Sequence, residues 1–262
     1  MTTSTMDRPR TADRTVPPPR VVGSELRKMF DTRSGFWLLC SIGILATLAT
    51  AAVVLWAPDD EVKYSTFGTA IGFPMAVILP IMAILSVTSE WSQRSALTTF
   101  TLVPHRSRVI GAKLLCAVGV GAVSMLLAFA IGAVGTVVGS ALAGVDPVWD
   151  TSISELALIV LANVLGLMVG FTLGVLIRSS AGAIVAYFVY SLVLPQLSSL
   201  LATTQDWFRD IAGWVDFNYA SSALFNGSLT GQQWAQLGVT TVAWVLVPMA
   251  VGVWLVSRSE VK

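Results

Sequence analysis

Six long apolar stretches constrain the fold of this 262-residue chain more than any other feature of its sequence. A helix needs about 20 apolar residues to cross the hydrocarbon layer of a membrane. The stretches that meet this length lie at about 36–57, 68–88, 110–143, 154–177, 181–202 and 236–256. The sequence therefore predicts an all-α integral membrane protein with six transmembrane helices.

The composition agrees with this expectation. Hydrophobic residues make up 55% of the chain and charged residues only 12%, whereas soluble domains carry about 25% charged residues. Such an apolar excess does not fit inside one core, so membrane lipid is expected to cover much of the surface. Cys40 and Cys116 both fall in apolar stretches, which favours buried thiols over a disulfide or a metal site.

Three regions follow one another along the chain. Residues 1–20 are rich in Thr, Arg and Pro and are expected to form a disordered cytoplasmic tail. Residues 21–35 combine apolar and basic side chains at helical spacing, which predicts an amphipathic helix along the inner leaflet. Residues 36–262 form the membrane domain, with a charged cytoplasmic segment at 89–108.

The basic residues predict the orientation. With six spans, every Lys and Arg except Lys63 and Arg209 falls on the side that holds both termini. Basic residues concentrate on the cytoplasmic side of membrane proteins, so both termini are expected in the cytoplasm and the protein in the cell membrane. Lys113 lies one turn inside the third span, from which we expect its side chain to reach back to the interface.

Glycines recur every fourth residue in two of the spans. They are Gly166, Gly170 and Gly174 in the fourth span, and Gly135 and Gly139 in the third. Faces without Cβ atoms let membrane helices approach closely. These faces fit packing within the chain or an interface with a second subunit, and the sequence leaves both open.

Several kinds of chemistry have no basis in the sequence. It contains no GxxxxGK[ST] motif for nucleotide phosphates and a single histidine, His105, so we expect no catalytic residue. No basic domain for nucleic acid is present outside the tail. No ionisable residue lies near the centre of a span, which argues against an ion-coupled carrier.

Three stretches carry a family resemblance. They are ELRKMFDTRSGFW at 25–37, the stretch from Glu90 to Lys113 with its pattern EWxxxSALTTFxLVPxRxRVxxAK, and DFNYASSALF at 216–225. With these motifs and its six spans, the chain resembles the permease subunits of ABC-2 type transporters, especially the small actinobacterial ones.

The resemblance implies an ATP-driven exporter with an N-terminal elbow helix and a coupling helix between spans two and three. The coupling helix would seat in a separate ATP-binding subunit, which holds ATP and magnesium, while this chain binds no cofactor. A second permease chain, identical or related, would complete the translocation route. The expected coupling residues are Glu90, Trp91, Arg94, Leu97 and Phe100, and the expected elbow residues are Glu25, Arg27 and Lys28.

Two other functions remain open. A non-transporting membrane scaffold or sensory component would use the charged segment only to dock a cytoplasmic partner. A secondary carrier would require an ionisable residue inside the membrane.

Overall fold

The described part of the computed structural model comprises residues 18–31, 33–92 and 106–258. Within these ranges, six helices are long and apolar enough to cross a membrane. The structure thus confirms the predicted number of spans and indicates a multi-pass membrane protein. No β-strand forms in the described ranges, where the only pairing of this kind is one isolated bridge between Lys63 and Val148.

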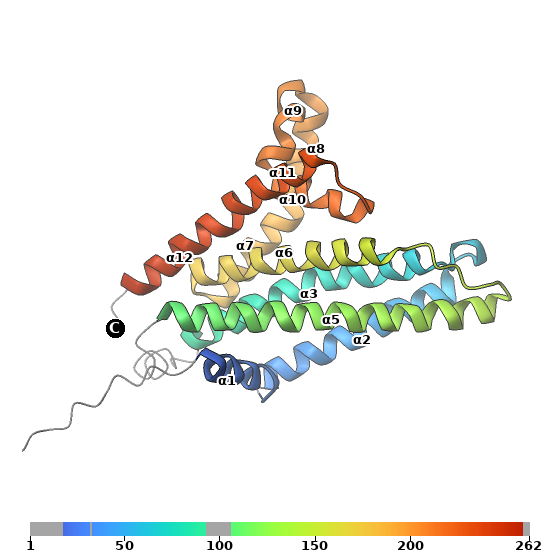
Figure 1. Ribbon diagram of the computed structural model, residues 1–262, viewed down its shortest axis with the longest axis horizontal. Coiled ribbons are helices and arrows are strands. Elements are labelled where there is room, and N and C mark those ends of the chain that lie inside the picture. The colour runs from blue at the N-terminus through green and yellow to red at the C-terminus, as the bar shows by residue number, and fades with distance from the viewer. Residues whose placement is uncertain (1–17, 32, 93–105, 259–262) are drawn as a thin grey trace, which may run out of the picture.

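The first four spans pack side by side as a bundle (Figure 1). Its helices are α2 (Arg33–Trp56), α3 (Tyr64–Ser92), α5 (Arg106–Ala143) and α6 (Ile153–Ile177), preceded by the short helix α1 (Pro18–Asp31). We call the end of the bundle where α1 lies the α1 end, and the opposite end, with the 3-10 turn η1 (Asp59–Glu61), the η1 end. Helix α12, the last of the chain, also finishes at the α1 end (Figure 1).

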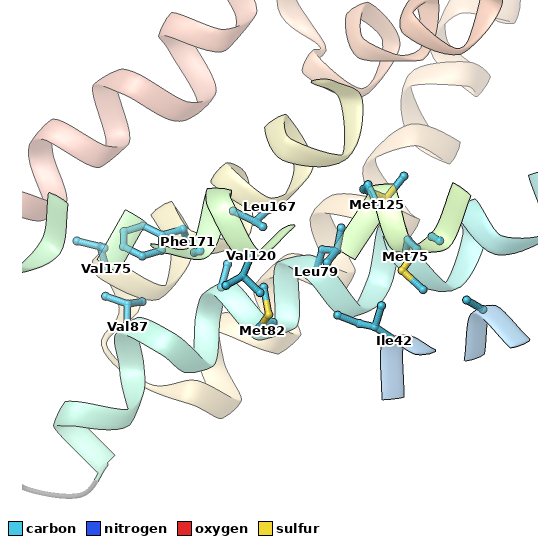
Figure 2. Packing of buried hydrophobic residues seen from close by; sticks show 14 of the residues in the cluster. Ile42, Met75, Leu79, Met82, Val87, Val120, Met125, Leu167, Phe171 and Val175 are labelled. Atoms are coloured by element: carbon cyan, nitrogen blue, oxygen red, sulfur yellow. The ribbon is translucent and has the colours of Figure 1, made fainter. Parts of the chain in front are cut away.

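Large apolar side chains fill the interior between these helices. Figure 2 shows side chains of α3 lined up against those of α5 and α6. The fully or almost fully buried residues of this core include Met75, Leu79, Met82, Val87, Val120, Met125, Leu167, Phe171 and Val175. Helix α3 is the most enclosed span: 44% of its most apolar 18-residue stretch is buried inside the chain.

Spans five and six diverge from this bundle (Figure 1). Span five consists of α7 (Ser180–Phe188), the π-helical turn η2 (Val189–Val193) and α8 (Leu194–Thr204). Span six consists of α11 (Gly231–Thr241), the π-helical turn η4 (Val242–Leu246) and α12 (Val247–Arg258). Between them lie α9 (Asp206–Val215), α10 (Phe217–Ser222) and η3 (Ala223–Asn226). Only 11% of the most apolar 18-residue stretch of span five is buried, so lipid or another chain must cover its apolar surface.

Prolines explain the π-helical turns. Proline has no N–H and its ring collides with the carbonyl four residues earlier in an α-helix. Pro195 and Pro248 each come directly after the residue that closes such a turn, since Leu194 N–H donates to Val189 O and Val247 N–H to Val242 O. The wider turn relieves the collision while the span stays helical.

Helix α1 begins at Pro18, three residues before the predicted start of the amphipathic helix at residue 21. Because the first N–H groups of a helix have no partner within it, prolines fit its first turn. Residues 1–17 lie outside the described residues.

Candidate functional site

The charged segment predicted to bind a partner begins where α3 ends. Glu90 and Trp91 belong to the last turn of α3, which finishes at Ser92. The other expected coupling residues, Arg94, Leu97 and Phe100, lie outside the described residues. The chain is described again from Arg106, where α5 begins at the same end of the bundle.

Helix α1 is fastened to α5 by a buried ion pair. Glu25 is 4% exposed, and its Oε2 lies 2.6 Å from Nζ of Lys113. Arg27, two residues further along α1, is exposed, and Lys28 is also part of α1. Of the expected elbow residues, Glu25 thus faces the bundle interior.

The expectation that Lys113 reaches back to the membrane interface is wrong. Its residue is 6% exposed, and Nζ donates a hydrogen bond to the Ser86 carbonyl of α3 at 3.1 Å in addition to the ion pair. Helix α1 covers this stretch of α5 and supplies a carboxylate at contact distance. A buried ammonium is tolerated where an opposite charge and further acceptors surround it, so Lys113 joins α1, α3 and α5.

A second contact fixes the direction of α1. The Cys116 thiol of α5 donates to the Val22 carbonyl of α1 at 3.4 Å, a weak hydrogen bond. Val22 precedes Glu25, whereas its partner Cys116 follows Lys113. The two contacts occur in opposite order along the two helices, so α1 runs antiparallel to α5 where they meet. Cys116 is buried and does not form a disulfide.

The turn between spans four and five also docks on α3 at the α1 end. The hydroxyls of Thr88 in α3 and Ser180 in α7 lie 2.7 Å apart. The turn is short because Arg178 adopts a left-handed conformation with φ of 56° and ends α6, and the Ser179 hydroxyl then caps α7 by accepting from Gly182 N–H.

Most of the regularly spaced glycines pack within the chain. A Cβ added at Gly170 would lie 2.8 Å from both Cβ and the carbonyl oxygen of Pro80, and one at Gly174 would lie 2.6 Å from Val87. Gly135 and Gly139 similarly meet α2, α3 and their connection, at the side chains of Thr50, Val54, Val62 and Phe67. Gly166 is different, because nothing lies within 4 Å of an added Cβ there.

Spans five and six meet through aromatic side chains. The Trp244 ring of η4 lies 5.7 Å from the Tyr190 ring of η2, and Trp244 Nε1 donates to Val215 O at 2.8 Å. Asn218 Nδ2 donates to Tyr190 O at 3.3 Å, the carbonyl five residues before Pro195. These contacts keep the two spans together where their helices are interrupted.

Asp216, the first residue of the DFNYASSALF stretch, is buried, and the sequence analysis gave its side chain no role. It is 8% exposed, and its Oδ1 accepts hydrogen bonds from the N–H groups of Asn218 and Tyr219. Its Oδ2 is buried without a hydrogen-bond partner. An acidic residue just before a short helix is typical of an N-cap, and this signal was present in the sequence.

At the η1 end, the connection after α5 closes over the start of α3. Asp150 accepts hydrogen bonds from the Ser65 N–H at 2.9 Å and the Ser65 hydroxyl at 2.5 Å. Partial burial acts to raise the pKa of the Asp150 carboxyl, but these hydrogen bonds and the positive charge of Lys63 outweigh it, so the pKa lies below the ordinary value of 3.8. Asp150 therefore stays charged as a cap on α3.

The fold and the contacts at the α1 end define a helical, multi-pass membrane protein. In the described ranges, no group of three or more His, Cys, Asp or Glu side chains could hold a metal ion. A scan against models of protein families finds no match, and a search of curated proteins also finds none.

Proposed function

We propose that this chain is the membrane-spanning permease subunit of an ABC-2 type ATP-driven exporter, with both termini in the cytoplasm of the cell that makes it. It forms part of the translocation route and couples to a separate ATP-binding subunit. ATP and magnesium are bound by that partner, and this chain contributes no catalytic residue.

The arrangement at the α1 end carries the proposal. Helix α1, the last turn of α3 and the first turn of α5 lie at one end of the bundle, and the buried Glu25–Lys113 pair joins the first to the third. Helix α3 ends at Ser92 and α5 begins at Arg106 at this end, so a partner that binds the segment at 89–108 acts directly on helix ends already held together. The resemblance at 25–37 and at 90–113 concerns the same region.

Close packing between the helices provides a way to transmit a displacement from one span to the next. Helices α3 and α6 touch at Gly170 and Gly174 with no room for a Cβ, and packed interiors transmit displacement because they compress little. Closure of the ATP-binding subunits would push on residues 89–104. The push would then pass from α3 to α6, and from α6 to spans five and six, which alternates access to the route.

A second permease chain fits the uneven burial of the spans. Span one has 17% and span five 11% of its apolar window buried in the chain, so a second copy or a related chain has ample apolar surface to cover. We place the route at that interface.

Co-purification tests the proposal. The tagged full-length chain is extracted from native membranes in mild detergent, and every co-purifying protein is identified. A stoichiometric partner with a phosphate-binding loop is expected, and its binding is expected to fall when Glu90 and Arg94 are both reversed in charge. The matched control reverses Lys63, a basic residue at the opposite end of the bundle, and retains the partner.

Failure to recover such a partner, under conditions that preserve other membrane complexes, would refute the transporter. A different stoichiometric cytoplasmic partner would instead favour the scaffold or sensory component.

A further inference from the structure

The Glu25–Lys113 pair buries opposite charges between two helices that are far apart in sequence. Both side chains are at most 7% exposed. The ion pair between Arg209 and Asp206, by contrast, is exposed and joins residues of one helix. Apolar side chains would hold α1 to α5 at least as well, because desolvation offsets most of the gain from a buried ion pair.

Charges differ from apolar contacts in how strictly they fix geometry. An apolar face tolerates sliding and rotation, whereas a buried ion pair has its full strength at one separation and leaves unpaired charges at any other. Lys113 Nζ also donates to the Ser86 carbonyl of α3, so the position of α1 is defined relative to two spans. The Cys116 thiol and the Val22 carbonyl set the direction of α1 along α5.

We infer that Glu25 and Lys113 are positioning residues for coupling: their ion pair makes α1 move as one body with α3 and α5. A displacement applied at the last turn of α3 or the first turn of α5 then reaches α1, and through α1 the start of α2. Spans five and six lie outside this body. The inference rests on the proposed function, because only an ATP-driven partner supplies the displacement.

Two measurements on the full-length chain in phosphatidylethanolamine–phosphatidylglycerol nanodiscs test it. The first needs no partner: spin labels at the exposed positions Arg27 of α1 and Leu115 of α5, in a Cys40→Ser background, report the distance between the two helices. The second compares MgATP hydrolysis by the partner with and without this chain.

In the otherwise unmodified chain, a narrow distance distribution is expected without the partner, and equally in the complex with the partner after trapping with ATP and vanadate. Lys113→Met is expected to broaden the distribution and to lower the chain's effect on partner hydrolysis by about fivefold or more, the scale of a typical coupling between sites, while the partner still co-purifies. The doubly exchanged Glu25→Lys/Lys113→Glu chain is expected to restore the narrow distance. It is expected to restore only part of the effect on hydrolysis, because a glutamate at position 113 cannot donate a hydrogen bond to the Ser86 carbonyl.

Arg209→Gln serves as the matched control, because it also removes an ion pair but an exposed one. It is expected to leave both measurements unchanged. The inference is overturned if Lys113→Met keeps a narrow distance, or if its distance broadens while hydrolysis responds as before. If no ATP-binding partner exists, the proposed function fails, and a narrow distance in Lys113→Met still separately refutes the positioning role.

Discussion

Replacing Gly170 by alanine tests the close contact of α6 with α3. The new Cβ would lie 2.8 Å from Cβ and the carbonyl oxygen of Pro80 and 3.0 Å from its Cα. Backbone atoms cannot move aside as a side chain can, so α6 must shift away from α3. Overpacking of this kind typically costs about 1–3 kcal/mol, against which alanine gains about 1 kcal/mol over glycine as a helix former.

Gly166→Ala supplies the matched comparison. It makes the same change one turn earlier in the same helix, where nothing lies within 4 Å of the added Cβ. The gain in helix propensity is common to both variants and cancels. We therefore expect Gly170→Ala to be less stable than Gly166→Ala by about 1–3 kcal/mol.

A third variant is expected to have an intermediate stability. The Cβ added by Gly121→Ala would meet Leu167 Cδ1 at 2.7 Å, the far end of a flexible side chain, so its stability is expected between the other two. The free energy of unfolding is measured in dodecyl maltoside by titration with SDS and followed by circular dichroism. Equal stabilities for Gly170→Ala and Gly166→Ala would refute the packing argument. A loss of dimer in Gly166→Ala, without loss of monomer stability, would assign its open face to a subunit interface.

Three further predictions concern single contacts. Lys113→Met removes the ammonium group that lies 2.6 Å from the buried Glu25 carboxylate and is expected to lower the free energy of unfolding by about 3–5 kcal/mol. The double variant Glu25→Gln/Lys113→Met is expected to lose clearly less in the same SDS titration. Because the folded pKa of Asp150 is lowered, its contribution to stability is present above pH 3.8 and is lost as pH falls through the folded pKa. Hydrogen exchange at the Ser65 amide is therefore expected to accelerate in the parent chain below the folded pKa. The same acceleration should be absent in Asp150→Asn. Trp244→Phe removes the hydrogen bond to a backbone carbonyl and is expected to cost about 0.5–1.5 kcal/mol; unchanged unfolding would show that this bond adds nothing.

Parts of the candidate site could be predicted from sequence because they depend on neighbours along the chain. Apolar length predicted that span two ends close to Glu90 and Trp91, and in the structure both residues belong to the last turn of α3. Their coupling role stays a prediction. The ion-pair partner of Lys113 could not be predicted in this way. Whether a lysine near the end of a span reaches the interface or finds a carboxylate depends on which other helix covers it, and Glu25 is far away in sequence.

The glycines show the same division. Their spacing indicated close packing, but Gly166 and Gly170 are equivalent in sequence and differ in the structure: one meets Pro80 and the other meets nothing. A repeat defines a face of one helix, while the position of the neighbouring helix decides which members of the repeat are covered.

The sequence by itself determined the number of spans and their approximate bounds, because these features depend on local hydrophobicity. Only the tertiary structure decided the direction of α1 along α5, the burial of Glu25 and Lys113, and the divergence of spans five and six from the other four. Membrane helices are all apolar on their surfaces, so hydrophobicity does not specify which faces meet. That choice is made by shape and by a few polar contacts between distant residues.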